Sequence, residues 1–184
     1  MVQRKVVFSV LAALGAWGFP AGAGAEVASS AFNGFTVRHV VPVSAERAAV
    51  YAAAVNDIGQ WWSAEHTVSG DAANLSLTTT IPGCFCESLG DQAGLVHMTV
   101  SFVNPGTIIR LTGGLGPLGL MGVNGNMTWE FDEADSGTVV TLQYSVGGYM
   151  DGGLDNVAGA VDAVLGEAMM RLKSYVETGN PDEA

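Results

Sequence analysis

The feature that most constrains the fold is a long amphipathic pattern near the C-terminus. Between Leu154 and Val176 apolar residues recur every three or four positions, which is the period of one face of an α-helix. The stripe consists of Leu154, Val157, Ala158, Val161, Leu165, Ala168, Met169, Leu172, Tyr175 and Val176. A helix of this length spans about 35 Å and must bury its stripe against a large apolar surface. Gly179 and Pro181 end it and begin a C-terminal tail, residues 179–184.

The segment before this helix indicates a sheet that could receive it. From Leu75 to Val146 apolar and polar residues alternate in short runs, separated by turn sequences such as Asn104-Pro-Gly106. The pattern predicts antiparallel strands at 75–81, 84–89, 95–103, 107–112, 126–132 and 138–146. The predicted fold class is therefore α+β, with a curved antiparallel β-sheet wrapped around the long C-terminal helix in a helix-grip arrangement.

The chain before residue 75 adds a first strand and a short helix pair. Residues 35–43 are rich in β-branched residues and predict a strand. Ser44 is the expected N-cap of a helix that runs to Asn56, and a second helical turn from Asp57 carries two tryptophans. The folded domain is expected to cover residues 35–178.

The first 25 residues have the pattern of a signal peptide. Arg4 and Lys5 precede an apolar run from Val6 to Trp17, and Ala23-Gly24-Ala25 has the small side chains that signal peptidase requires. A transmembrane helix needs about 20 apolar residues, and this run is shorter. We therefore expect cleavage after Ala25, a periplasmic or secreted protein, and a flexible leader over residues 26–34.

The charge balance excludes several classes of partner. The chain has 18 acidic and 7 basic side chains and a net charge of −11, and signal cleavage would remove Arg4 and Lys5. Such a surface repels phosphate backbones and anionic lipid head groups. We expect no nucleic-acid binding and no stable membrane insertion after cleavage. No motif indicates a cofactor, and the sequence does not indicate the oligomeric state.

The two cysteines, Cys84 and Cys86, are separated by a single residue. On a regular strand their Cβ atoms would lie about 6.5–7 Å apart, whereas a disulfide needs about 3.8 Å. A disulfide between them therefore requires a bulge or a tight turn, and two free thiols are the alternative. A further alternative is a soft-metal site in which both sulfur atoms and His97 bind copper(I) or zinc.

Several motifs resemble those of the START-like (SRPBCC) superfamily. They are Asn56-Asp-Ile-Gly-Gln-Trp-Trp62, Gly83-Cys-Phe-Cys-Glu87, Val96-His-Met98, Asn104-Pro-Gly106, Gly113-Gly-Leu-Gly-Pro-Leu118, Gly125-Asn-Met-Thr-Trp129, Gly147-Gly-Tyr149 and Ala160-Val-Asp-Ala-Val164. The chain is similar to the polyketide cyclase/dehydrase-like and heat-shock-ATPase-activator-like branches. The resemblance covers nearly all of the chain after the signal and implies a helix-grip fold with a cavity between sheet and helix. The expected export argues against the chaperone-binding role of cytosolic relatives.

Large aromatic and polar residues are the candidate ligand contacts in this implied cavity. They are Trp61, Trp62, His66, Arg110, Met121, Trp129 and Tyr144. One of Trp61 and Trp62 is expected at the cavity mouth and the other in the core. Trp129 and Tyr144 share the apolar faces of adjacent strands, which favours core packing over cavity lining. The polar anchor would be either His66 or Arg110.

The glycine-rich segment 113–125 contains the apolar residues Leu115, Leu118, Leu120 and Met121. It lacks the Gly-Lys-Ser/Thr ending of a phosphate-binding loop, so phosphate binding is not expected. The alternatives are a lid over the cavity and an ordinary long hairpin.

The expected function is non-catalytic: an exported carrier or sensor of an apolar or amphipathic small molecule. The catalytic alternative is an enzyme of the cyclase or dehydratase type, with Glu87 and His97 as an acid–base pair. Hydrolase motifs of the Gly-x-Ser-x-Gly and His-Glu-x-x-His types are absent from the sequence. In the strand 95–103, Val96, Met98 and Phe102 are expected on the apolar face and His97 on the polar face.

Overall fold

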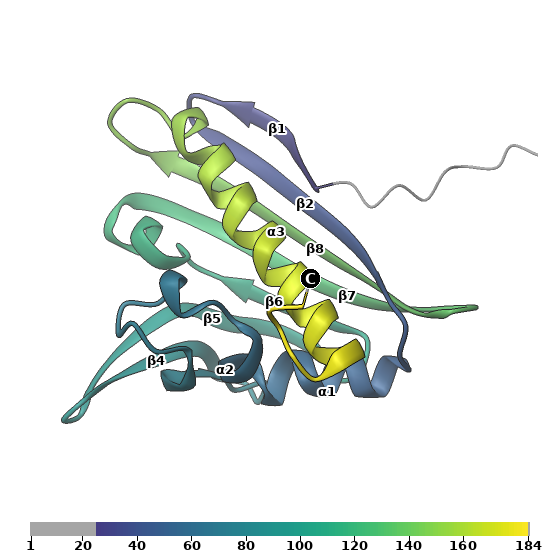
Figure 1. Ribbon diagram of the computed structural model, residues 1–184. Coiled ribbons are helices and arrows are strands. Elements are labelled where there is room, and N and C mark those ends of the chain that lie inside the picture. The colour runs from purple at the N-terminus through teal and green to yellow at the C-terminus, as the bar shows by residue number, and fades with distance from the viewer. Residues whose placement is uncertain (1–24, 184) are drawn as a thin grey trace, which may run out of the picture.

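A single antiparallel sheet and one long helix form the framework of the protein. The computed structural model describes residues 25–183, so the expected signal peptide lies outside the described residues except for Ala25. The strands are β1 (Ala25–Ala31), β2 (Gly34–Val43), β3 (Leu75–Leu77), β4 (Gly83–Gly90), β5 (Ala93–Asn104), β6 (Ile108–Thr112), β7 (Gly122–Ala134) and β8 (Gly137–Tyr149). They pair in the order β1-β2-β8-β7-β6-β5-β4-β3. The sheet curves around the C-terminal helix (Figure 1), which confirms the predicted helix-grip α+β fold.

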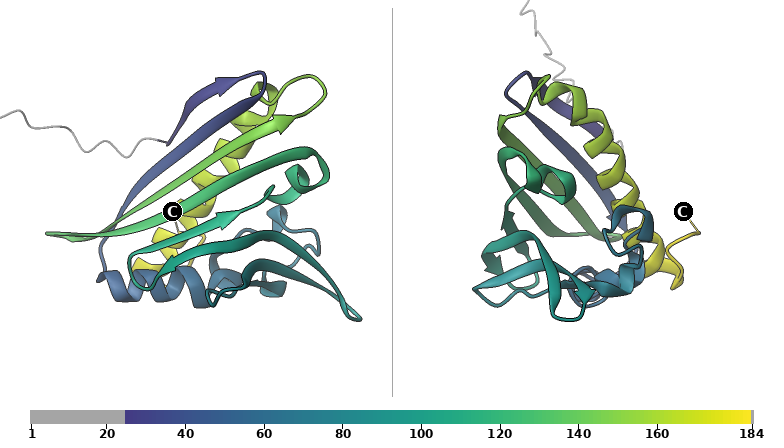
Figure 2. Two further views of the ribbon diagram at one scale, coloured as in Figure 1. Left: turned by 180° about the vertical axis from the view of Figure 1, so that it is seen from behind. Right: turned by 90° about the vertical axis from the view of Figure 1, so that its left-hand side faces the viewer.

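The helices lie on one face of the sheet (Figure 2). They are α1 (Arg47–Asn56), α2 (Ile58–Trp61) and α3 (Asp155–Thr178), with the short 3-10 helices η1 (Ala64–His66), η2 (Ala72–Asn74) and η3 (Gly116–Leu120). The long helix α3 packs mainly on β2 and β1, and it also contacts α1 and α2. Its apolar stripe supplies fully buried side chains such as Leu165 and Leu172. The helix ends at Gly179, whose left-handed backbone (φ 82°) allows its N–H to donate to the Tyr175 carbonyl.

Helix α1 begins later than expected. The N-cap position is occupied by Glu46, whose side chain makes no capping hydrogen bond. Ser44, the expected N-cap, instead donates its backbone N–H to Glu177 Oε1 of α3 at 2.7 Å. Ser44 lies three residues before Arg47, the first residue of α1, and is therefore too early in the chain to be its N-cap.

The segment 26–34 is not a flexible leader. Most of it belongs to β1, which pairs antiparallel with β2 and forms one edge of the sheet. Of the side chains described in β1, Val27 packs against the core and the residues that follow it are exposed. Because the side chains after Val27 do not enter the core, they need not be apolar. The small, polar composition of β1 therefore gave no strand pattern in the sequence.

Two irregularities in β5 change which of its residues face the helix. The pairing with β4 skips His97, and the pairing with β6 skips Ser101. A β-bulge of this kind inserts one residue and breaks the alternation of faces. As a result His97 is buried beside Met98, while Val96 and Phe102 are 58% and 43% exposed. The predicted faces were correct at Met98 and wrong at Val96, His97 and Phe102.

A second buried histidine lies between β2 and α3. His39 Nε2 is 3.1 Å from Asp162 Oδ1, without the alignment of a hydrogen bond. Burial lowers the pKa of His39, and the Asp162 carboxylate opposes this change. Gly166 makes room for the ring, since a Cβ atom there would lie 3.0 Å from His39 Cε1. The close packing of α3 on β2 therefore depends on a residue without a side chain.

Candidate functional site

A cavity of about 380 Å³ lies between α3 and the β4–β5 part of the sheet. Its volume is within the range of about 300–1,000 Å³ that is typical of small-molecule sites. Helix α3 contributes Val157, Ala160, Val161 and Val164 from its N-terminal half, and the sheet contributes Phe85 of β4 and His97 of β5. Val157 and Val161 belong to the apolar stripe of α3, and Ala160 and Val164 are apolar residues outside it.

Two loops complete the wall of the cavity. The first contains η1 and contributes Trp62 together with residues 65–68. The second lies between β6 and β7, contains η3, and contributes residues 115–118 and Met121. The glycine-rich segment therefore forms part of the cavity wall, in agreement with the alternative that placed it over the cavity.

The second loop is fixed to the sheet by the hydroxyl group of Tyr144. This hydroxyl accepts a hydrogen bond from the Leu115 N–H and donates one to the Gly113 carbonyl, each at 3.0 Å. Burial raises the pKa of Tyr144, opposed by the bond from Leu115, so the hydroxyl stays protonated and can donate. Tyr144 itself is fully buried and positions the wall without lining the cavity.

On the sheet side of the cavity, Glu87 and His97 form a buried polar pair. Glu87 Oε2 lies 2.9 Å from His97 Nε2, and both side chains are almost fully buried. The register skip in β5 turns His97 inward, where its ring packs 5.1 Å from that of Phe85. The structure therefore brings together the two residues that the sequence analysis named as a candidate acid–base pair.

Glu87 also fixes the first loop. Its two carboxylate oxygens accept hydrogen bonds from the backbone N–H groups of Val68 and Ser69. Burial raises the pKa of Glu87, but the hydrogen bonds from Ser69, Val68 and His97 outweigh this effect and lower the pKa to about 2. Glu87 is therefore an ionised acceptor at neutral pH and joins the loop to the sheet.

The mouth of the cavity carries a more exposed polar pair. His66 Nε2 of the first loop lies 3.0 Å from Glu167 Oε2 of α3, and Glu65 lies exposed beside it. Trp62 donates its indole N–H to the His66 carbonyl at 3.3 Å and packs on Phe85 at a ring distance of 5.3 Å. The wall is thus aromatic inside and polar at its rim.

The structure separates the predicted ligand contacts into two groups. Trp62, His66 and Met121 line the cavity. Trp61 and Trp129 pack against each other in the core, as expected for one tryptophan of the 61–62 pair and for Trp129.

Arg110 is a wrong candidate for the polar anchor. It lies in β6 with its side chain exposed, over the Phe102 ring and beside Thr128. Alternation in β6 buries its neighbours Ile109 and Leu111, so Arg110 points to the opposite face of the sheet from α3.

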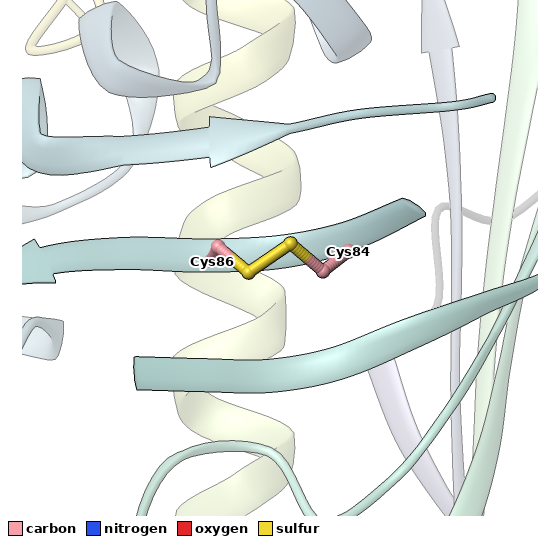
Figure 3. The surroundings of a disulfide bond; sticks show 2 residues. All are labelled: Cys84 and Cys86. Carbon is pink, nitrogen blue, oxygen red and sulfur yellow. A yellow bond between two sulfur atoms is a disulfide. The ribbon is translucent and has the colours of Figure 1, made fainter. Parts of the chain in front are cut away.

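The two cysteines form a disulfide on β4, as Figure 3 shows. Their Cα atoms are 5.4 Å apart, closer than the roughly 6.6 Å of a regular strand. The irregularity that accompanies this contraction lies in the partner strand β5, which gains a residue opposite β4. Of the two alternatives, the disulfide is therefore present and the free thiols are not.

The soft-metal alternative is also corrected by this arrangement. Both sulfur atoms are bonded to each other, and His97 faces the interior while Cys84 and Cys86 alternate with the buried Phe85 and Glu87. In residues 25–183 no group of three or more His, Cys, Asp or Glu side chains gathers as a metal site would require.

None of the helices in that range has the length and apolar composition to cross a membrane.

Several cavity residues were missed by the sequence analysis. On α3, Val157 and Val161 were assigned only to the buried stripe, and Val164 was named only in a motif of the family resemblance. Phe85 could have been found from its alternation with Glu87 on β4. The cavity residues of the η1 loop left no periodic pattern in the sequence, because they lie on irregular backbone.

The pKa of Glu87 predicts how stability depends on pH. The ordinary value is 4.5 and the folded value about 2, so its stabilising effect is complete above pH 4.5 and is lost as the pH falls to about 2. The difference corresponds to about 3 kcal/mol. We expect the free energy of unfolding to fall more steeply over this range in the wild type than in Glu87→Gln, measured by urea denaturation.

The exposed substitution Glu130→Gln on β7 removes the same charge elsewhere and should retain the wild-type slope. If the free energy of unfolding depended on pH equally in the wild type and in Glu87→Gln, the low pKa of Glu87 would be contradicted.

The comparisons with known proteins agree with this fold. A sequence profile of the family described as "Polyketide cyclase / dehydrase and lipid transport" matches residues 34–177. A search of curated proteins gives no match. Similar solved structures include a conserved protein from Enterococcus faecalis, EF2215, with a TM-score of 0.58 and 15% identity over 84% of this chain and 77% of that chain.

Two further structures are similar at the level of the fold. DynU16, a protein of the dynemicin biosynthetic locus, has a TM-score of 0.58 and 22% identity over 79% of this chain, which spans 48% of DynU16. The Aha1 dimer from Colwellia psychrerythraea has a TM-score of 0.54 and 13% identity over 78% of this chain and 97% of that one. Since the profile covers most of the chain, the protein belongs to the polyketide cyclase/dehydrase and lipid transport family of the START-like (SRPBCC) superfamily.

Proposed function

We propose that the protein is an exported binding protein that holds an apolar or amphipathic small molecule in the cavity between the sheet and α3. The observation that carries the proposal is the cavity itself, whose volume of about 380 Å³ is bounded mainly by apolar side chains. Membership of a family whose description includes lipid transport supports the same class of ligand.

The construction of the wall also supports binding. The apolar interior would gain free energy by removing apolar ligand surface from water, at about 25 cal/mol per Å². Both loops that enclose the cavity are fixed to the sheet, one through Glu87 and the other through Tyr144. A site that is already ordered before binding loses less conformational entropy when the ligand enters.

The export part of the proposal rests on the sequence of residues 1–25. Arg4, Lys5 and the apolar run after them lie outside the described residues, and their pattern is that of a signal peptide. The disulfide between Cys84 and Cys86 supports the same location, since disulfides persist in oxidising compartments such as the periplasm.

Binding can be tested with N-phenyl-1-naphthylamine, an uncharged dye that fluoresces in apolar surroundings. We expect saturable binding by the mature wild type and at least roughly tenfold weaker binding by Ala160→Trp, because the indole would occupy the cavity rim. The matched control is Ala163→Trp, on an exposed position of the same helix that does not line the cavity. Equal affinities of both variants, or no dye binding by the folded wild type, would contradict the proposal.

A second candidate function is favoured by the Glu87–His97 pair. A carboxylate that orients an imidazole at the wall of an apolar cavity is a common arrangement for general acid–base catalysis. The reaction class would be the cyclisation or dehydration of a poly-β-carbonyl compound, in keeping with the name of the family.

This candidate predicts turnover that depends on the pair. With a synthetic poly-β-ketone and product detection by mass spectrometry, Glu87→Gln and His97→Gln should each lower the rate by about 100-fold or more. Turnover that persists in both variants, or that is absent from the wild type, would remove the enzymatic alternative for this substrate class.

A further inference from the structure

The disulfide between Cys84 and Cys86 closes a very short loop. The two residues are two positions apart and are the only cysteines of the chain. A disulfide stabilises a fold mainly by restricting the unfolded chain, and this effect decreases as the closed loop becomes shorter. The domain also has an apolar core drawn from the helices and most of the strands, so it does not need the cross-links that small secreted domains require. The bond therefore contributes little to the stability of the whole fold.

The disulfide and the cavity lie on opposite faces of β4. Cys84 and Cys86 alternate with Phe85 and Glu87, whose side chains are buried on the side of α3. Both cysteines are half-buried, and the backbone of β4 is paired on both sides at these positions, so the exposed part of each residue belongs to its side chain. The bond runs along the strand (Figure 3). A small reductant can therefore reach it from the outer face of the sheet without entering the cavity.

The disulfide spans the point at which β5 carries an extra residue. Cys84 pairs with Thr99 and Cys86 with Val96, so two steps along β4 correspond to three along β5. The residue that β5 gains is His97. The cysteine Cα atoms are 5.4 Å apart, below the roughly 6.6 Å that two residues of a regular strand span. A contracted β4 favours the bulge, because a bulged strand follows a longer path than its partner.

The same part of β4 positions the sheet side of the cavity wall. Phe85, which lies between the two cysteines, lines the cavity and packs on Trp62 and His97. Glu87, the residue after the disulfide, binds His97 and accepts hydrogen bonds from two backbone N–H groups of the η1 loop. A change in the spacing of β4 would therefore displace an aromatic wall residue and the anchor of a loop together.

We infer that the Cys84–Cys86 disulfide is a redox-sensitive device that holds the β4–β5 wall of the cavity in its binding form, and that reduction of this bond weakens ligand binding without unfolding the domain. This inference rests on the proposed binding function and adds the regulation of the same site. Export brings the chain into an oxidising compartment, so the cavity reaches its binding form there.

Opening the device is a two-electron reaction with a dithiol as the reductant. A thiolate of the reductant attacks one sulfur atom of the bond, forms a mixed disulfide and expels the other cysteine as a thiolate. The second thiol of the reductant then displaces the first cysteine, and the reductant leaves as a disulfide. Two electrons and two protons pass to Cys84 and Cys86, whose S–S bond is replaced by two S–H bonds. The contraction of β4 is then no longer imposed.

The first test compares dye binding before and after treatment with dithiothreitol, with complete reduction confirmed by the added mass of two hydrogen atoms. We expect the reduced protein to bind N-phenyl-1-naphthylamine at least about fivefold more weakly and to keep its circular dichroism spectrum. Cys84→Ser/Cys86→Ser should bind like the reduced protein and should not respond to dithiothreitol. The control Thr99→Ser, at an exposed position opposite Cys84, should keep both the wild-type affinity and the response.

The second test follows the wall itself and needs no ligand. The backbone N–H groups of Val68 and Ser69 are bound to Glu87, so they should exchange slowly with solvent deuterium in the oxidised protein. We expect their exchange, resolved by NMR, to become about fivefold or more faster after reduction. The N–H group of Leu115, bound to Tyr144 in the other loop, is the internal reference and should keep its rate.

The outcomes separate this inference from the proposed function. Equal dye affinities of the oxidised and the fully reduced protein, or unchanged exchange at Val68 and Ser69, would overturn the inference and leave the binding function in place. Unfolding on reduction would also overturn it, because the bond would then support the whole fold. Failure of the dye to bind the oxidised protein would contradict the proposed function, and the exchange rates would still decide whether the bond holds the wall.

Discussion

The position of α3 on the sheet is the constraint on which the cavity depends. The helix packs mainly on β2 and β1 at one side of the sheet, where His39 and Gly166 allow a close approach. The helix packs little on the interior face of β4 and β5, and the η1 and η3 loops line the space between them. Those strands still carry buried aromatic and apolar residues such as Phe85. The space between them and the helix is therefore enclosed by loops and becomes a cavity instead of solid core.

Polar anchors inside an apolar wall keep these loops in place. Glu87 joins the η1 loop to β5, and Tyr144 joins the η3 loop to β8. Buried polar groups are costly unless they are fully bonded, and once bonded they specify one geometry. Glu87 satisfies this condition, whereas His97 keeps a free Nδ1.

The sequence predicted regular structure well and irregular structure poorly. The stripe of α3 and the alternation in β6, β7 and β8 are long periodic signals, so the fold followed from them. The bulge at His97 and the edge strand β1 leave no periodic trace, and both were mispredicted. Of the site, Trp62, His66 and Met121 were found because large or polar side chains are conspicuous. Arg110 was a wrong candidate because the alternation in β6, which places it on the opposite face of the sheet from α3, was not considered. The hydrogen bonds between Tyr144 and the η3 loop could not be predicted, because they depend on the path of that loop.

The most direct test of the account is native mass spectrometry of the mature protein, purified without detergent from the envelope of the cells that produce it. The account predicts a chain that begins after Ala25 and carries the additional mass of a small apolar molecule, which is released on denaturation. A folded protein of bare chain mass, obtained repeatedly under conditions that retain apolar ligands in other proteins, would contradict the claim that the cavity holds a ligand.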